Sequence, residues 1–327
     1  MNKLLSIVGP TATGKTQTAL TLAKKILADN LVTGIDLISA DSRQVYRGLE
    51  VLTGADIPAG FSQKTSPSDQ NLANSCYANA DNSIRLFGVS IIKPTDEWSV
   101  AHFQLMAREI IQRSWQTGRL PVLVGGTGLY HDQLLTSDTR LHIGPNPEVR
   151  QKAESMSLTE LQHWLSQLDS QRLIRMNHSD LNNPRRLIRA IEIASAQVNH
   201  PTQVQLPVDE LTLVLTAPLQ LIEDKINKRV AERFQSGAVV EVQALLSQNI
   251  EPKSPVMSSL GVVELTEFLS GALDSSASQK LWALHELQYA RRQITWWKNK
   301  SGVTRLDITQ PDYLNQAENL ARSWLSG

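Results

Sequence analysis

LLSIVGPTATGKTQTAL, residues 4–20, joins two patterns that together indicate how this chain folds. The apolar run at residues 4–8 predicts a buried β-strand, and the residues after position 14 begin a predicted helix. Between them, residues 9–16 match G-x-x-x-x-G-K-[ST], a glycine-rich loop that holds phosphate groups. Since this pattern is informative only between a strand and a helix, its placement here predicts a phosphate site.

The loop has the chemistry of an anion site. Its glycines let backbone N–H groups converge on anionic oxygens, and the helix N-terminus adds a partial positive charge. Lys15 would bridge outer phosphate oxygens, and the Thr16 hydroxyl would ligate Mg²⁺. The predicted phosphate contacts are Gly9, Thr11, Ala12, Thr13, Gly14, Lys15 and Thr16. ATP, GTP and an organic pyrophosphate all satisfy such a loop, and the alternative is a turn that binds no ligand.

Further short apolar runs predict the rest of a sheet, at residues 35–39, 89–92, 120–124 and 211–215. Runs that are apolar on both faces and bounded by turn residues are typical of buried parallel strands with helices between them. We therefore expect an α/β fold, with a P-loop NTPase-like parallel sheet flanked by helices. The polar residues 59–83 show no period and predict a long surface loop.

The length of 327 residues exceeds what one hydrophobic core usually organises. A mostly helical stretch from about Pro147 to Ala196 separates two of the predicted strands. We expect a helical insertion at residues 141–204 within a core formed by residues 1–140 and 205–327. Two or three amphipathic helices are expected after Leu219.

Composition limits the possible partners and compartment. Lys plus Arg equal Asp plus Glu at 32 each, so a polyanion must be attracted by local basic patches and not by net charge. The single cysteine, Cys76, excludes an internal disulfide and argues for a reducing, cytoplasmic compartment. No segment approaches ~20 uninterrupted apolar residues, so no membrane span is expected. Four histidines lack metal-ligand spacing, namely His102, His163, His178 and His285.

A second motif, SADSRQVYRGL at residues 39–49, follows the second predicted strand. A carboxylate at the carboxyl end of a parallel strand lies in the crevice where open α/β sheets bind ligands. Asp41 is therefore placed to accept a proton. The strand at 120–124 leads into GGTGLY, residues 125–130, and not into the acidic residue by which a P-loop kinase or ATPase would organise Mg²⁺.

These blocks resemble the tRNA dimethylallyltransferases, the adenosine-37 isopentenyltransferases, and the related adenylate isopentenyltransferases. The resemblance spans nearly the whole chain in the expected order, and its last four blocks favour the tRNA enzymes. Those four blocks are LPVLVGGTGLY at 120–130, NNPRRLIRAIEI at 182–193, KINKRVAERFQSGAVVEVQALL at 225–246 and YARRQITWWKN at 289–299.

The resemblance implies that the phosphates belong to dimethylallyl diphosphate. The N6 amine of adenosine 37, in the anticodon stem-loop of a tRNA, would attack the allylic C1 as pyrophosphate leaves. Asp41 would be the base, Thr16 would act in catalysis with Mg²⁺, and Arg229 would be a further pyrophosphate cation. The implied substrate contacts are Thr11, Asp41, Ser42, Gln44, Gly126, Thr127, Gly128, Arg185, Arg186, Arg292 and Gln293. A helical arginine such as Arg229 is equally a solvated or ion-paired surface residue.

Two basic segments correspond to RNA contacts in the family: Arg185, Arg186 and Arg189, then Arg291, Arg292, Lys298 and Lys300. Cations interleaved with aromatic rings suit unpaired bases, although at least one of Trp296 and Trp297 is expected to pack in the core. The chain departs from the family where RLFGVSI, residues 85–91, replaces a histidine-bearing block, and where LGVVE, residues 260–264, replaces IGYKE.

Two rival interpretations share part of this evidence. A small-molecule P-loop kinase would have the same phosphate loop, but it does not account for GGTGLY or for the basic C-terminal blocks. A catalytically degenerate paralogue would bind tRNA without modifying it. Under the main interpretation we expect a monomer.

Overall fold

The computed structural model describes residues 2–55, 57–64, 71–196 and 203–327. The chain divides into two compact units, Met1–Leu134 with Pro207–Gly327, and Leu135–Leu206. The second unit begins and ends within a few residues of the predicted helical insertion at 141–204.

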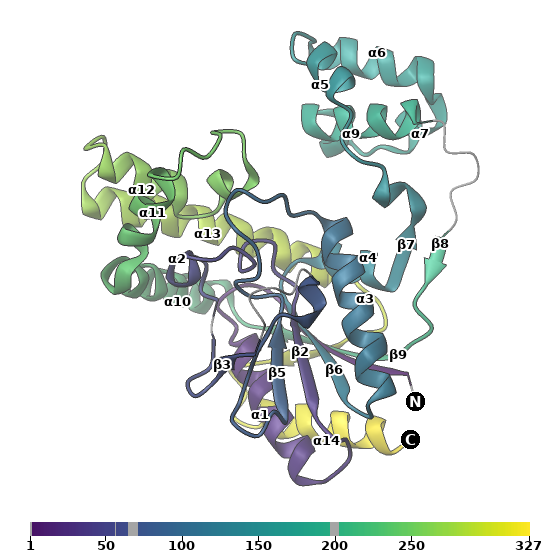
Figure 1. The fold of residues 1–327 in the computed structure, drawn as a ribbon, viewed down its shortest axis with the longest axis vertical. Coiled ribbons are helices and arrows are strands. Elements are labelled where there is room, and N and C mark those ends of the chain that lie inside the picture. The colour runs from purple at the N-terminus through teal and green to yellow at the C-terminus, as the bar shows by residue number, and fades with distance from the viewer. Residues whose placement is uncertain (1, 56, 65–70, 197–202) are drawn as a thin grey trace. The chain divides into compact units, whose positions relative to one another are not determined.

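An eight-stranded sheet is the centre of the first unit within the described residues, in the order β10-β9-β1-β6-β2-β5-β4-β3 (Figure 1). Its strands are β1 Lys3–Val8, β2 Ile35–Ser39, β3 Ser62–Gln63, β4 Cys76–Ala78, β5 Ile84–Phe87, β6 Leu120–Gly125, β9 Asp209–Thr216 and β10 Thr304–Asp307. All pairings among the six longer strands are parallel, whereas β3 and β4 add an antiparallel edge. The predicted α/β fold is confirmed.

One predicted strand is wrong. The apolar run at 89–92 lies just after β5, and only Ile92 makes an isolated bridge, to Tyr46. Gly88 and Ser90 have φ angles of 78° and 50°, which interrupt extended backbone on either side of Val89. The strand therefore ends at Phe87, one residue before the first of these turns.

The expectation of a surface loop at residues 59–83 is wrong in part. Cys76 and Ala78 are buried and belong to β4, which pairs with β5, and β3 pairs with β4 in turn. Three alternating residues give too short a period to be recognised among polar neighbours. Residues 65–70 of this segment lie outside the described residues.

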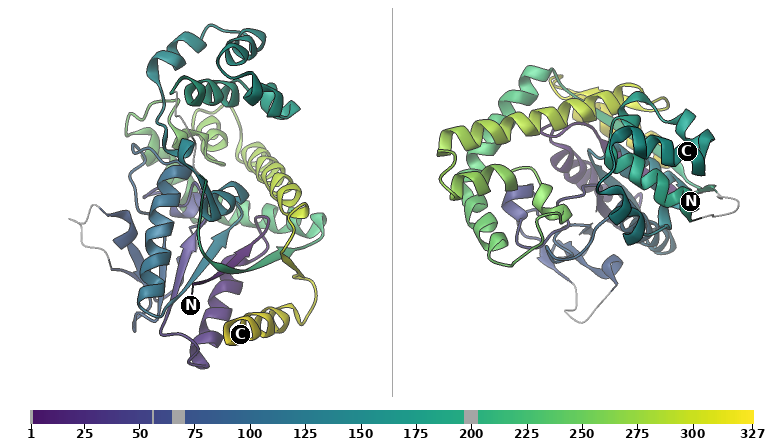
Figure 2. Two further views of the ribbon diagram at one scale, coloured as in Figure 1. Left: turned by 90° about the vertical axis from the view of Figure 1, so that its right-hand side faces the viewer. Right: turned by 90° about the horizontal axis from the view of Figure 1, so that it is seen from above.

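Helices cover both faces of the sheet, as Figures 1 and 2 show. α1, Lys15–Ala28, and α14, Tyr313–Ser326, pack together on one face, and α3, Val100–Gln116, lies on the other. The core between α1, α14 and the strands is aliphatic, with Ile7, Leu22 and Leu213 fully buried. This packing fixes the strand ends from which the site loops depart.

After β9 the chain is mostly helical. The helices before α14 are α10 Leu219–Arg233, α11 Val239–Leu246, α12 Val262–Leu269 and α13 Ser275–Lys298. The expectation of two or three helices is therefore too low. Gly237, with φ 118°, separates α10 from α11 within one amphipathic stretch, which is why the helical pattern looks continuous in sequence. α10 and α13 pack against each other.

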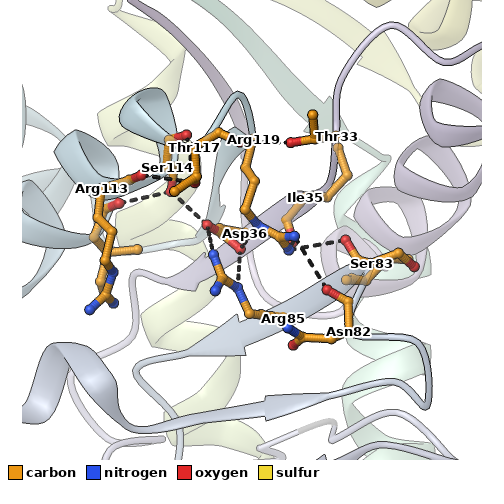
Figure 3. A network of polar contacts seen from close by, with 12 residues as sticks. Thr33, Ile35, Asp36, Asn82, Ser83, Arg85, Arg113, Ser114, Thr117 and Arg119 are labelled. Atoms are coloured by element: carbon orange, nitrogen blue, oxygen red, sulfur yellow. Dashed lines mark hydrogen bonds and ion pairs between the residues drawn. The ribbon is translucent and has the colours of Figure 1, made fainter.

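A buried ion network ties the amino ends of the central strands together (Figure 3). Asp36 of β2 is 1% exposed and accepts two hydrogen bonds of 2.7 Å from Arg85 of β5. Arg119, just before β6, donates to the same carboxylate at 2.8 Å, and the Ser114 hydroxyl of α3 donates at 2.7 Å. Each charge is thus paired where an unpaired one would be costly.

The second unit is a small helical body with its own core. Its helices are α5 Pro147–Ala153, α6 Leu158–Leu168, α7 Ser170–Arg175, α8 His178–Leu181 and α9 Pro184–Ser195. Leu161, Leu165, Leu187 and Ile191 are among its buried residues. At the two ends of this unit, β7, Thr136–Asp138, pairs antiparallel with β8, Gln203–Gln205. Across the described residues of both units, every helix is too short or too polar to span a membrane.

Candidate functional site

The glycine-rich loop connects β1 to α1, as its motif predicts. Lys15 Nζ and Thr13 Oγ1 both donate to the carbonyl oxygen of Pro10 at 2.8 Å, which curls the loop back on itself. α1 begins after Gly14, and within the described residues no side chain caps this end of the helix. The first N–H groups of α1 are therefore directed to whatever anion the loop accepts.

Three loops leave the sheet at one edge because their strands are neighbours. β6 lies between β1 and β2, with Val8 opposite Gly125 and Ser39 opposite Val124. All three strands are parallel, so the phosphate loop, the Asp41 segment and the GGTGLY segment emerge side by side. This topology places the GGTGLY segment beside a phosphate loop that lies more than a hundred residues earlier in the sequence.

A cavity of about 960 Å³ opens at this edge. Most of the predicted site residues line it: Thr11, Ala12, Gly14, Lys15, Thr16, Asp41, Ser42, Gln44, Gly126, Arg229, Arg292 and Gln293. Gly9, Thr13, Thr127 and Gly128 lie in the same loops but are not among the lining residues. Arg185 and Arg186 belong to the second unit. The anion-binding loop and the candidate base therefore face one cavity.

Asp41 is held by its own backbone segment. Its Oδ1 accepts the N–H of Arg43 at 2.8 Å and that of Gln44 at 3.4 Å, which is an Asx turn. Tyr289 also lines the cavity, and burial, helped by the negative charge of Asp41, raises the pKa of its phenol to about 12. Tyr289 is therefore a hydrogen-bond donor at neutral pH, and its hydroxyl lies 3.3 Å from Oγ1 of Thr127.

α13 contacts two of the three loops, the phosphate loop and the GGTGLY segment. Oε1 of Gln293 accepts the N–H of Thr11 at 2.8 Å, which fixes the phosphate loop. A Cβ on Gly126 would lie 2.1 Å from Nε2 of Gln293, and one on Gly128 would lie 2.1 Å from Nε1 of Trp296. Gly126 and Gly128 therefore leave room for the close approach of α13.

Arg229 of α10 reaches the phosphate loop and is also ion-paired. Its Nη2 donates to Oγ1 of Thr11 at 2.7 Å and to the carboxylate of Glu286. Arg229 thus lines the cavity and is also ion-paired, and its role as a pyrophosphate cation stays a prediction. Sequence reasoning missed Glu286 and Tyr289, although their spacing from Gln293 along one helix face was a usable signal.

The two tryptophans of α13 have different environments. Trp297 is 1% exposed and packs with Val8 and Val214, which confirms that at least one of the pair belongs to the core. Trp296 is 39% exposed. It lines a second, shallower cavity of about 630 Å³ with Arg291, Arg292 and Lys300. The predicted alternation of cations with an accessible aromatic ring is therefore present here.

The basic cluster of α9 is largely engaged inside its own unit. Arg189 donates to Glu192 at 3.2 Å and to the carbonyl of Ile143 at 2.7 Å, so it holds the unit together. Arg186 pairs with Asp180 and remains exposed, as does Arg185. Arg185 and Arg186 are thus more exposed than Arg189, which is only half-buried.

The strand order and the glycine-rich loop at the carboxyl edge of the sheet define a P-loop NTPase-like α/β protein with a helical insertion. Residues 44–300 match the IPP transferase family, and this chain belongs to that family. A tRNA dimethylallyltransferase of Thermomicrobium roseum is 32% identical, with 99% of this chain and 93% of the relative covered. One from Halalkalibacterium halodurans is 30% identical over 95% of this chain and 93% of its own length.

Solved structures agree with this assignment. The full-length tRNA isopentenylpyrophosphate transferase of Bacillus halodurans superposes with a TM-score of 0.66 at 28% identity, and covers 100% of this chain and 97% of its own. A eukaryotic dimethylallyltransferase acting on tRNA has the same fold, with a TM-score of 0.74 at 21% identity over 98% of this chain and 78% of its own.

Proposed function

We propose that this protein transfers the dimethylallyl group of dimethylallyl diphosphate to N6 of adenosine 37 in the anticodon loop of a tRNA, and releases pyrophosphate. The observation that carries the proposal is the single cavity lined by Lys15 and Thr16 of the phosphate loop and by the Asp41 carboxylate. Membership of the IPP transferase family, and relatives named tRNA dimethylallyltransferase, support the identity of both substrates.

The leaving group sets the main chemical demand. The C1–O bond of the donor breaks while the N6–C1 bond forms, and the departing pyrophosphate gains negative charge. Preorganised N–H groups at the start of α1, together with Lys15 and Arg229, would stabilise that charge where it develops. The exocyclic amine of adenine is a poor nucleophile, so the reaction depends mainly on stabilising the leaving pyrophosphate.

Asp41 would orient the amine and then remove its proton. The Asx turn occupies Oδ1 with two backbone N–H groups, so that Oδ2 is the oxygen offered to the substrate. The turn also prevents the carboxylate from rotating away between cycles. The phenol of Tyr289, protonated at neutral pH, would donate a hydrogen bond within the same cavity.

Mg²⁺ would be held mainly by the diphosphate of the donor and only to a small extent by the protein. No group of three or more His, Cys, Asp or Glu side chains suited to a metal occurs among the described residues. Mg²⁺ nevertheless needs few protein ligands, since it keeps waters and binds phosphate oxygens. Thr16, at the end of the phosphate loop, would be its protein ligand. When bound, the ion supplies positive charge to the leaving pyrophosphate.

The RNA would approach the exposed end of α13. Trp296 offers a stacking surface, and Arg291, Arg292 and Lys300 surround it with positive charge. The target adenine must leave its stack to reach the cavity beside Asp41. The proposed enzyme would act as a monomer in the cytoplasm, where it would meet its tRNA substrate.

Incubation of the protein with Mg²⁺, dimethylallyl diphosphate and an anticodon stem-loop carrying adenosine 37 tests the proposal, with nucleoside mass analysis as the measurement. A dimethylallyl adenosine is expected, and a stem-loop lacking that adenosine should stay unmodified. Release of ADP from ATP with any acceptor would instead identify a small-molecule kinase. Salt-sensitive RNA binding without transfer, at any donor concentration, would identify a degenerate paralogue.

A further inference from the structure

A buried carboxylate at the site has no role in the reaction described above. Glu286 lies on α13, and only 5% of its side chain is exposed. It accepts hydrogen bonds from two arginines of α10, from Nη2 of Arg229 and from Nη1 of Arg233 at 3.0 Å. Since a buried charge is tolerated only with close partners, each of the three side chains constrains the other two.

Through Arg229 this carboxylate reaches the phosphate loop. Nη2 of Arg229 donates to Glu286 and also to the Thr11 hydroxyl, the latter at 2.7 Å. The guanidinium is therefore held between α13 and the loop, at the wall of the cavity. An arginine fixed in this way loses less conformational freedom when an anion binds than a mobile one does.

Through Arg233 the same carboxylate reaches the segment that follows the candidate base. A Cβ built on Gly54 would lie 1.7 Å from Nη2 of Arg233, so the guanidinium rests directly against this glycine. The Gly54 carbonyl in turn accepts a hydrogen bond from Nε2 of Gln44 at 2.7 Å. Glu286 thus links the phosphate loop to the segment that carries Asp41 and Gln44.

We propose that Glu286 is a positioning residue that holds the guanidinium of Arg229 toward the diphosphate of the donor. This inference rests on the function proposed above. A negative charge in a diphosphate cavity repels the ligand, so attraction cannot account for Glu286, whereas orientation of two cations can. Two guanidinium groups around one carboxylate still leave the cluster with a net positive charge.

Glu286→Gln separates orientation from charge, because the two roles predict opposite signs. The amide keeps the size of the side chain and removes its charge. If Glu286 orients Arg229, the dissociation constant for dimethylallyl diphosphate, measured by titration calorimetry without RNA, rises about tenfold. If Glu286 only neutralises charge, the more positive cavity binds the donor more tightly, and the proposal is wrong.

Two further variants test the route of the effect. Glu286→Asp keeps the charge but withdraws it by one methylene, so donor binding should still weaken, and wild-type affinity would contradict the proposal. In an Arg229→Gln background, Glu286→Gln should cause little further loss, because the two residues act through one contact. Fully additive losses would show that Glu286 does not act through Arg229.

The second unit offers a matched control. Glu192 is also a buried carboxylate between two arginines, with Arg150 at 2.8 Å and Arg189 at 3.2 Å. Glu192→Gln should leave donor affinity unchanged. An equal loss of donor affinity in this variant would show that the effect of Glu286→Gln is not specific to the site. If Glu286→Gln does not fold, as judged by urea unfolding, Glu286→Asp decides the question.

The unsubstituted protein distinguishes the two possible failures. If it binds neither dimethylallyl diphosphate nor pyrophosphate, the proposed function fails. If it binds both and the Glu286 variants bind them equally well, only the role of Glu286 fails.

Discussion

Asp41 combines two properties that a proton acceptor needs, a fixed orientation and access to the substrate. Its Asx turn supplies the first, and its place in the wall of the cavity supplies the second. Asp41→Asn keeps the shape and the acceptor for the turn but removes the basic oxygen. We expect the rate of transfer, measured at saturating substrates, to fall by about 10²–10⁴-fold while donor affinity changes little.

Lys15→Ala should affect a different property from Asp41→Asn, namely donor binding. Lys15 lies in the phosphate loop, so its loss should weaken donor binding and turnover together. Donor affinity in each variant is measured by calorimetry and turnover by formation of the modified nucleoside. An unchanged rate in Asp41→Asn would exclude it as the base, and an unchanged affinity in Lys15→Ala would refute the diphosphate assignment.

The candidate site divides at the residue scale into a part that sequence reasoning finds and a part that it does not. Lys15, Thr16 and Asp41 could be predicted because each lies in a short motif whose chemistry is local. The spacing of Glu286 from Gln293 indicates which face of the helix it shares, but not its partners, because a helical glutamate looks the same whether it faces solvent or two arginines. The role of Glu286 depends on the packing of α10 against α13, which no local sequence pattern indicates.

At the scale of elements, α13 determines the geometry of the loops. A Cβ on Gly126 would meet Nε2 of Gln293 at 2.1 Å and the carbonyl oxygen of Gly9 at 3.0 Å. Gly126→Ala should therefore push Gln293 away from the Thr11 N–H, weaken donor binding, and destabilise the protein by about 1–3 kcal/mol. Urea unfolding and donor titration measure the two effects.

Gly144→Ala is the control for this prediction, since a Cβ at Gly144 meets nothing within 4 Å and the residue lies in the second unit. It should change neither the stability nor the donor affinity. Equal behaviour of the two variants would mean that α13 does not press on the loop.

Elements could be predicted from the sequence where their pattern is long or buried. β1, β2, β6 and β9 are mostly apolar and largely buried, so their runs stand out. β4 has three residues in a polar segment, and β3 has two, so their position at the sheet edge follows from pairing with β5 and not from composition. The break at Gly237 likewise depends on its positive φ angle, which the amphipathic pattern across α10 and α11 does not show.

At the scale of the whole molecule, a buried charge cluster makes stability depend on pH. His131 is 5% exposed, with Nε2 at 2.8 Å from Oε1 of Glu210 and Nδ1 at 3.5 Å from Asp132. Burial lowers the pKa of His131, but the hydrogen bonds to Asp132 and Glu210 outweigh this effect and raise the pKa to about 9. The same contacts hold the pKa of the Glu210 carboxyl below its usual range.

The sign of the effect follows from the raised pKa of His131. Unfolded histidine titrates near ~6.5, so the stabilisation is fully present below that pH and is lost as the pH rises through about 9. We expect the free energy of unfolding, measured in urea, to fall on the order of 2 kcal/mol between pH 6.5 and 9.5.

His131→Asn removes the titrating group and should flatten this part of the pH profile. A fall in stability that is just as steep in the variant would assign the effect to other groups. Glu210 affects stability at low pH, because the stabilisation from its lowered pKa is present above the pKa of unfolded glutamate and is lost in acid.

The contact between Gln293 and Thr11 joins residues 282 positions apart. During synthesis on the ribosome, the glycine-rich loop leaves the exit tunnel long before the helix that locks it. The nascent chain therefore lacks a complete cavity until translation is nearly finished, and an incomplete polypeptide that ends before α13 is not expected to bind the proposed donor.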